Sequence, residues 1–395
     1  MNYQFSDRMA AMQPSLVREI LKATANPAII PFAAGNPAPD AFPVEEVRRI
    51  TAGILQENPI GALQYSVTEG YPALREKVKE MLENHYGIPT KDNDLIIISG
   101  AQQGADLATK ALVNEGDTVL CEDPSFVGVL NCFRSYHCNL VGVEMESDGI
   151  NLEKLEKAMQ EQPNVKLLYL IPNFQNPTGI TTSEAKRREV LRLAKKYNVM
   201  ILEDNPYGDL RYSGTPLPSI KSFDDAGQVI YIGSFSKILA PGIRVGFVLA
   251  PKPIIEKMTV GKQCADVHTP ILVQMIAERF LSTCDLAAHI EKIRSLYRGK
   301  LSLMLDGIQA EFAPSIAYTR PEGGMFLWCT LPKGADMIDF CNRGIAEKVA
   351  VVPGVAFLAK ETDPCRSFRM NFTTPTDEGI VEGIKRLGKL TRELF

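Results

Sequence analysis

A lysine that directly follows a predicted strand is the residue of this chain best placed to do chemistry. Lys237 lies in the segment 231–246, which contains Ser-Phe-Ser-Lys and continues into an apolar stretch. A surface position is the common outcome for lysine, because lysine is almost never buried without a partner. An amine that forms a Schiff base must be neutral when it attacks, and burial beside other cations favours the neutral form. Three nearby residues offer a phosphate site beside this amine: Ser234, Ser236 and Arg244.

A carboxylate ends a second apolar run. Asp204 closes the run 199–204 and is followed by a turn that contains Tyr207. Ligands in open α/β sheets bind beyond the carboxyl ends of the strands, so this side chain can face a ligand. A turn aspartate is the simpler interpretation of Asp-Asn-Pro. Against a pyridine nitrogen, however, a carboxylate would keep that nitrogen protonated, and a protonated ring is a better electron sink.

Three further segments carry candidate binding residues. Asn176 lies in Asn-Pro-Thr-Gly, which is typical of a tight turn, but its amide and the Tyr207 hydroxyl could donate to a ring phenolate. Arg369 is either an ion-paired surface residue or a two-pronged fork for a substrate carboxylate. A strand-to-helix turn can bind an anion through its backbone N–H groups, and here that turn contains Gly100, Ala101 and Gln102.

These candidates need a scaffold that brings distant segments together. Strands covered on both faces are predicted where Val, Ile and Leu gather without polar alternation, at 95–98, 118–121, 167–171, 199–202, 229–232 and 245–249. Helical patterns lie between several of these runs, at 102–113, 152–160 and 183–197. The alternation predicts a large α/β domain with a mostly parallel sheet over 45–280. A smaller α+β domain is predicted from 1–44 and 281–395, with a long helix at 285–312, strands at 317–319 and 325–329, and a terminal helix at 376–394.

Composition narrows the function classes. The 395 residues exceed the size of one hydrophobic core, and 45% hydrophobic with 23% charged residues is ordinary for a globular enzyme. The formal net charge of -4, without a Lys/Arg block, argues against a nucleic-acid partner. No secretory signal and no apolar run of about 18 residues is found, so we expect no membrane contact. Eight cysteines without a CxxC pair predict reduced thiols in the cytoplasm, and the four histidines lack metal-ligand spacing, so no metal is expected.

Taken in this order, the segments resemble the class I/II aminotransferases of pyridoxal phosphate (PLP) fold type I. Asn-Pro-Thr-Gly, Asp-x-x-Tyr at a strand end, Ser-x-Ser-Lys and a downstream Arg occur together in that family. Here Asp204 precedes Lys237 by 33 residues (237 − 204), and Arg244 follows Lys237 by 7 (244 − 237). The resemblance extends from Pro31 to the C-terminus. Segments 63–76 and 320–328 make it closest to the 2-aminoadipate/kynurenine aminotransferase group.

The resemblance implies a cofactor, pyridoxal 5'-phosphate, and a role for each candidate. Lys237 would form the Schiff base and shuttle a proton, Asp204 would pair with the pyridine nitrogen, and Asn176 with Tyr207 would bind the ring oxygen. The phosphate would be held at the turn formed by Gly100, Ala101 and Gln102, together with Ser234, Ser236 and Arg244. Phe126 would stack on the ring where many relatives carry Tyr, and Ala101 stands where several relatives carry Ser. Each of these two departures removes one hydroxyl group.

The resemblance also implies substrate contacts and a partner. Arg369 would bind the substrate α-carboxylate, and Gly35 would lie beside the substrate. Tyr65 would reach the phosphate of a partner subunit, so a homodimer with shared active sites is expected. Arg18 either pairs with a distal substrate carboxylate or is an exposed helix arginine.

The implied reaction moves an amino group between an L-amino acid and a 2-oxo acid, with 2-oxoglutarate as the expected acceptor. The expected range is broad or includes 2-aminoadipate, aromatic and branched-chain substrates. A PLP-dependent lyase or racemase is an alternative, because the fold does not fix the reaction. A regulator with an aminotransferase-like effector domain is less favoured, since few residues precede Pro31. A nucleotide-binding enzyme would leave Lys237, Asp204 and Asn176 without a shared purpose.

Overall fold

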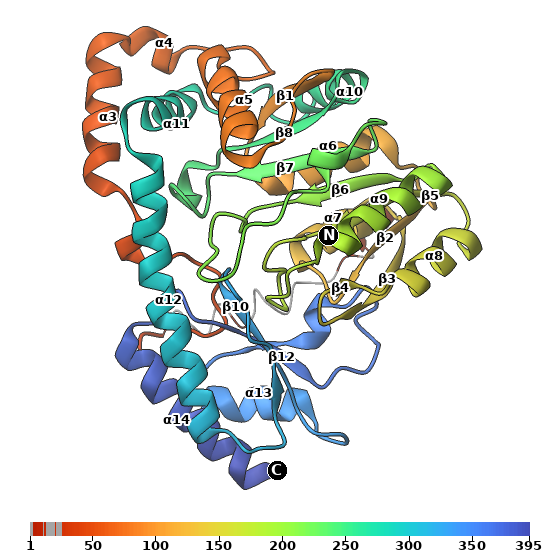
Figure 1. Ribbon diagram of the computed structural model, residues 1–395, viewed down its shortest axis with the longest axis vertical. Coiled ribbons are helices and arrows are strands. Elements are labelled where there is room, and N and C mark those ends of the chain that lie inside the picture. The colour runs from red at the N-terminus through yellow and green to blue at the C-terminus, as the bar shows by residue number, and fades with distance from the viewer. Residues whose placement is uncertain (1–2, 11, 13–19, 21–25) are drawn as a thin grey trace.

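Two sheets of different size organise the chain in this computed structural model, which describes residues 3–10, 12, 20 and 26–395 (Figure 1). The larger sheet has eight strands in the order β1 (Asn93–Ile98), β8 (Gly246–Pro251), β7 (Val229–Ser234), β6 (Met200–Asp204), β5 (Val165–Leu170), β2 (Thr118–Asp123), β3 (Asn139–Glu146) and β4 (Gly149–Ile150). The smaller sheet has four antiparallel strands in the order β11 (Val352–Pro353), β12 (Ser367–Asn371), β10 (Phe326–Thr330) and β9 (Ala317–Tyr318).

Helices cover both faces of the larger sheet. One face packs on α6 (Ala101–Leu112), α7 (Val127–Ser135) and α10 (Lys252–Gln263). The other face packs on two groups of helices: α8 (Leu152–Glu161) with α9 (Glu184–Tyr197), and α3 (Val44–Glu57), α5 (Pro72–Tyr86) and α11 (Ile271–Thr283). This double cover explains why the strands are apolar on both sides, as the sequence predicted.

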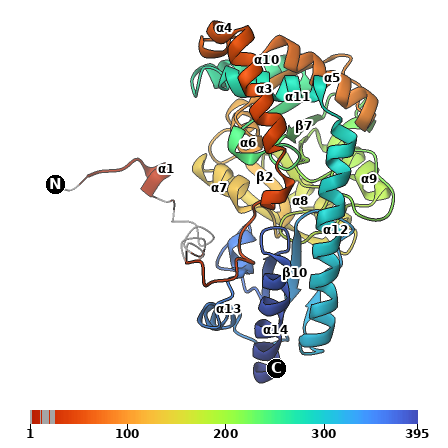
Figure 2. The same ribbon diagram turned by 90° about the vertical axis from the view of Figure 1, so that its left-hand side faces the viewer.

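The remaining helices are α1 (Asp7–Ala10), α4 (Pro59–Leu63), α12 (Leu286–Glu311), α13 (Met337–Ala346) and α14 (Asp377–Leu394), with short 3-10 turns η1 (Pro39–Ala41), η2 (Lys221–Phe223), η3 (Pro241–Ile243) and η4 (Gly354–Phe357). Of these helices, α12, α13 and α14 lie around the smaller sheet, and α4 lies beside α3 and α11 (Figure 1). The 26-residue α12 extends from the level of the larger sheet down to α14 (Figure 2). Ile290 of α12 joins the core under α3 and α11, whereas Ile308 joins the core of the smaller sheet. No helix in the described part of the chain is both long and apolar enough to cross a membrane.

The predicted elements agree with the structure in type, although the structure also contains elements that were not predicted. β8 runs antiparallel to both β1 and β7, although its apolar pattern resembled that of a parallel strand. Burial on both faces gives the same pattern in either direction, so the sequence could not show this. β3 was not predicted, because most of its side chains are exposed or half-buried. The division of the chain near residue 280 stays a prediction.

Strand direction and side-chain alternation together determine where the polar residues lie. β2, β5, β6 and β7 are mutually parallel, so their carboxyl ends share one edge of the larger sheet. Because successive side chains point to opposite faces, Asp204 lies on the same face as Leu202, which packs with α6 and α7. Glu203 points to the other face, where its carboxylate accepts the backbone N–H groups of Ile220 and Lys221 at 2.9 and 2.8 Å.

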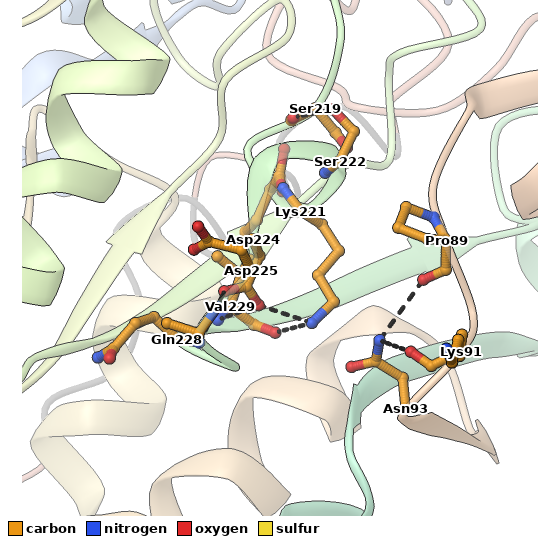
Figure 3. A network of polar contacts seen from close by, with 12 residues as sticks. Pro89, Lys91, Asn93, Ser219, Lys221, Ser222, Asp224, Asp225, Gln228 and Val229 are labelled. Atoms are coloured by element: carbon orange, nitrogen blue, oxygen red, sulfur yellow. Dashed lines mark hydrogen bonds and ion pairs between the residues drawn. The ribbon is translucent and has the colours of Figure 1, made fainter.

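A buried ion pair fixes the loop that leads into β7 (Figure 3). Lys221 Nζ donates to Asp224 Oδ2 at 2.9 Å and to the Val229 carbonyl at 2.8 Å. The Asp224 carboxylate also accepts the backbone N–H groups of Gln228 and Val229, at 2.9 and 3.0 Å. The two side chains are 2% and 0% exposed, so neither charge has water as an alternative partner. This cluster determines where β7 begins.

Asp224→Ala should therefore lower the free energy of unfolding by about 3–5 kcal/mol, because it leaves the buried Lys221 ammonium without its ion-pair partner. Urea denaturation measures the change. The adjacent Asp225 is a matched control: its side chain is 79% exposed, so Asp225→Ala should change the free energy of unfolding by less than about 0.5 kcal/mol. Equal losses in the two variants would contradict the assignment.

A buried glutamate at the end of β2 makes stability depend on pH. Glu122 is 0% exposed, and its Oε2 accepts from the Ile171 N–H at 3.0 Å and from Gln175 Nε2 at 3.2 Å. Its Oε1 has no hydrogen-bond partner among the described residues. Burial raises the pKa of this carboxyl to about 8, compared with about 4.3 in an unfolded chain.

Because the folded pKa is the higher one, folded Glu122 binds more protons than the unfolded residue between about pH 4 and pH 8. Its contribution to stability is full below the unfolded pKa and is lost as pH rises through the folded pKa. Glu122→Gln removes this loss. The free energy of unfolding of the variant, relative to that of the wild type, should therefore increase by more than about 1 kcal/mol between pH 5 and pH 9. Unfolding curves at successive pH values measure the gain. The exposed Glu153→Gln serves as control, and parallel wild-type and Glu122→Gln curves would refute the assignment.

Candidate active site

A cavity of about 370 Å³ lies where the carboxyl ends of the parallel strands meet the smaller sheet. It is large enough for a small-molecule ligand. It gathers residues that are as far apart in the sequence as Gly35 and Arg369. Its lining includes twelve of the predicted site residues: Gly35, Ala101, Gln102, Phe126, Asn176, Asp204, Tyr207, Ser234, Ser236, Lys237, Arg244 and Arg369.

The amine of Lys237 lies inside this cavity. Its Nζ donates to the Gly35 carbonyl at 3.0 Å, and no carboxylate forms an ion pair with it among the described residues. Burial, reinforced by the charges of Arg369 and Arg244, lowers the pKa of this amine to about 8. A substantial neutral fraction is therefore present near pH 7–8, as a nucleophilic or proton-transferring amine requires.

Asp204 offers an unused carboxylate oxygen on the floor of the cavity. Its Oδ2 accepts a hydrogen bond from the Tyr169 hydroxyl at 2.9 Å. Its Oδ1 is buried and has no hydrogen-bond partner among the described residues. Burial raises the pKa of this carboxyl to about 7. A buried oxygen without a partner is costly, so this site favours a ligand that brings a proton donor or a positive charge.

A chain of hydrogen bonds joins the two sheets across the cavity. Asn176, in the loop after β5, donates through Nδ2 to the Tyr207 hydroxyl at 3.3 Å. Its Oδ1 accepts from Arg369 Nη1 at 2.9 Å, and Arg369 is on β12 of the smaller sheet. Burial, more than any charge, raises the pKa of Tyr207, which keeps its hydroxyl protonated and able to donate.

The Arg369 guanidinium is held on its faces and along part of its edge. The rings of Phe326 and Phe357 lie 4.2 and 4.9 Å from its centre, and Nη2 donates to the Ala33 carbonyl at 2.9 Å. Nε is buried without a partner among the described residues. Burial lowers the pKa of this group to about 10, so it remains charged at neutral pH. Its remaining N–H groups are available to a planar anion such as a carboxylate.

The opposite end of the cavity gathers groups that suit an anion. α6 begins at Ala101 without a side-chain cap, so its first backbone N–H groups have no intrahelical partner. Gly100 precedes it with φ 82°, and a Cβ there would lie 2.0 Å from Arg244 Nη2. Only glycine allows this approach of the guanidinium to the turn. The Ser234 and Ser236 hydroxyls lie 3.0 Å apart beside the same space.

Three predicted site residues are not among the described lining of the cavity. Gly100 does not line the cavity itself but makes room for Arg244. Tyr65 is 83% exposed, and its ring meets that of His268 edge-on at 5.9 Å, outside the cavity of its own chain. Arg18 lies outside the described residues. The sequence reasoning assigned no role to Tyr169, Ala33, Phe326 and Phe357, because buried aromatic and small residues resemble ordinary core positions.

The donor set fits pyridoxal 5'-phosphate. Asp204 Oδ1, buried without a partner among the described residues, would accept from a protonated ring nitrogen. Asn176 and Tyr207 would suit a ring oxygen, the α6 start with Arg244 would suit a phosphate, and Lys237 would supply the amine. No group of three or more metal-ligating side chains occurs in the part of the chain that the structure describes.

Comparisons with known proteins agree with this geometry. The aminotransferase class I and II family matches residues 27–387. Aromatic-amino-acid aminotransferase 1 of Thermococcus litoralis is 40% identical over 393 residues, which are 98% of this chain and 94% of the relative.

Two solved structures share the fold over nearly their whole length. Kynurenine aminotransferase of Pyrococcus horikoshii, solved with PMP, superposes with a TM-score of 0.96 at 40% identity, covering 99% of this chain and 97% of that one. The α-aminoadipate aminotransferase of Thermus thermophilus, solved with N-(5'-phosphopyridoxyl)-L-leucine, gives a TM-score of 0.90 at 37% identity, with 99% and 97% covered. The chain therefore belongs to the class I and II aminotransferases, enzymes that use pyridoxal 5'-phosphate to move an amino group between an amino acid and a 2-oxo acid.

Proposed function

We propose that this aminotransferase acts on L-amino acids with aromatic or other large apolar side chains, with 2-oxoglutarate as the amino acceptor. The observation that carries this proposal is the apolar cavity wall, which, apart from the ring-stacking Phe126, is formed by Val127, Val129, Ile171 and Phe326. Of the described lining residues, the cations are Lys237, Arg244 and Arg369, and each already has a role. The names of the aromatic and kynurenine relatives point to the same substrate class.

The proposed mechanism divides the work among the residues of the cavity. PLP, when bound, supplies an electron sink for the substrate Cα. Arg369, held between two rings, binds the substrate α-carboxylate and so fixes the position of Cα. Lys237 Nζ, with its pKa near 8, takes up the Cα proton of the amino acid donor and, in the opposite half-reaction, delivers a proton to the corresponding carbon of the 2-oxo acid acceptor. The packed aromatic wall excludes water from these transfers.

Other residues of the cavity maintain the charges that this reaction needs. Asp204 Oδ1 holds a proton at the ring nitrogen, and Tyr169 keeps the carboxylate oriented. Asn176 links the ring-oxygen site to Arg369 through its two amide atoms. The α6 start, Ser234, Ser236 and Arg244 would bind the phosphate, and Phe126 would stack on the ring.

We further propose a homodimer in which Tyr65 reaches the phosphate site of the partner subunit. An exposed apolar group on and after α4 supports this proposal: Ile60 is 74%, Leu63 is 73% and Tyr65 is 83% exposed. Such a cluster is typical of an interface.

A reducing compartment such as the cytoplasm is the proposed location. All eight cysteines, each within the described residues, are free thiols. Cys264, after the end of α10, is exposed, and the others are buried or half-buried.

Lys237→Ala should abolish the near-visible absorption of lysine-bound PLP and lower turnover at least about 10²–10⁴-fold, because the chain loses its amine and its proton carrier. Absorption spectra and 2-oxoglutarate-dependent turnover of phenylalanine measure the two effects. Lys257→Ala, exposed on α10, should behave like the wild type. Wild-type turnover that does not require a 2-oxo acid would point to the alternative lyase or racemase reaction, and full turnover by Lys237→Ala would remove the central role of this lysine.

Arg369→Lys should lower kcat/KM for the amino acid about 10²-fold, because lysine keeps the charge but loses the planar fork that binds a carboxylate with two bonds. Steady-state kinetics with the amino acid as the varied substrate measure this. Arg366→Lys is the matched control, since Arg366 is exposed and lies just before β12. An unchanged KM and kcat in Arg369→Lys would rule out the carboxylate role.

A further inference from the structure

A charged segment lies behind the phosphate end of the cavity. Lys262, in the last turn of α10, has a side chain that is 0% exposed, which is rare for lysine. Its Nζ donates to both oxygens of Asp266, at 2.8 and 3.0 Å, and to Gln103 Oε1 at 2.7 Å. Every donor of this buried ammonium is thus directed to a partner.

Asp266 and Gln103, the two partners of Lys262, also hold the turn that precedes α6. Asp266 Oδ2 accepts from the Ser99 hydroxyl at 2.7 Å and from Gln103 Nε2 at 2.9 Å. Gln103 Oε1, held by Lys262, also accepts the Ser99 backbone N–H at 2.8 Å. Ser99 is therefore fixed through both its backbone and its side chain.

Ser99 connects this network to the anion site. Its carbonyl accepts from Arg244 Nη2 at 3.4 Å, and the next residue is Gly100, against which the Arg244 guanidinium packs. Lys262, Asp266, Ser99 and Gln103 do not line the cavity themselves. Any effect that they have on a bound phosphate must therefore pass through the position of the turn and of Arg244.

The segment is anchored on its other side as well. Thr269 Oγ1 lies 3.1 Å from the Ser99 hydroxyl, and the Thr269 carbonyl accepts from Gln274 Nε2 at 2.6 Å. His268 Nε2 accepts the Ser66 backbone N–H at 3.2 Å. Residues 262–269 are thus connected both to the 99–103 turn and to the loop that carries Tyr65.

We propose that Lys262 and Asp266 are positioning residues for the cofactor phosphate: the ion pair between the buried Lys262 ammonium and the more exposed Asp266 carboxylate holds the 99–102 turn so that the α6 N–H groups and Arg244 converge on one anion. This inference rests on the proposed phosphate site. A purely structural ion pair would stabilise the fold without distinguishing a phosphorylated ligand from an unphosphorylated one. A positioning pair must make that distinction.

Asp266→Asn tests the proposal, because it keeps the size of the side chain and removes the charge opposite Lys262. The apoenzyme is titrated with PLP and separately with pyridoxal, which lacks the phosphate, and Kd is read from the absorption change. The Kd of PLP should rise about tenfold or more, as expected for loss of a charge-assisted contact, and that of pyridoxal should change less than about twofold. Glu256→Gln, exposed on α10, should leave both values unchanged.

Ser99→Ala is a milder second variant if Asp266→Asn does not fold, since it leaves the Lys262–Asp266 ion pair in place and removes only the Ser99 hydroxyl with its contacts to Asp266 and Thr269. Ser99→Ala should raise the Kd of PLP by a smaller factor than Asp266→Asn does, and it should leave the Kd of pyridoxal nearly unchanged. An equal rise in the Kd of PLP and the Kd of pyridoxal, or no change in either Kd, would overturn the positioning role. If the wild type itself binds PLP no more tightly than pyridoxal, the phosphate site fails and the inference fails with it. If the wild type binds PLP more tightly than pyridoxal, but Asp266→Asn has the same two Kd values as the wild type, the phosphate site stands and only the positioning role of Lys262 and Asp266 is refuted.

Discussion

Desolvation of ionisable groups in a single cavity is the constraint on which the rest of the site depends. Burial lowers the pKa of Lys237 to about 8 and raises that of Asp204 to about 7, so the uncharged form of each group becomes more populated near neutral pH. Arg369 stays charged despite burial, because its pKa of about 10 is still far above neutral. The surrounding residues supply the hydrogen bonds and contacts that water would give to exposed charges. Tyr169 satisfies one oxygen of Asp204, and Ala33, Asn176 and two rings hold the guanidinium.

The site also depends on contact between the two sheets. Asn176 follows β5 of the larger sheet, whereas Arg369 lies within β12 of the smaller one. Their 2.9 Å hydrogen bond therefore exists only when the sheets are packed together. Ala33, near the start of the described chain, completes the arrangement by accepting from Arg369. Three separate stretches of sequence thus meet at one substrate-binding group.

The sequence was most informative where a single physical cause, such as burial, produces a recognisable pattern of residue types. Burial on both faces made β1, β5 and β7 recognisable as apolar runs, and polar residues at their ends indicated the site. Strand direction left no such trace, so the antiparallel β8 could not be distinguished from its neighbours. The roles of Asp204 and Asn176 came from the family resemblance, since an isolated Asp-Asn-Pro or Asn-Pro is as typical of a turn. Phe326 and Phe357 could not be singled out, because their contact with Arg369 requires knowledge of distant packing.

The exposed thiol of Cys264 lies two residues from both Lys262 and Asp266. Because the other cysteines are buried or half-buried, a maleimide dye should attach there first. Such a dye would sit beside the segment that holds the phosphate turn, yet outside the catalytic cavity. Cofactor loading could then be followed as a fluorescence signal from the native chain, without a new cysteine and without relying on the colour of PLP.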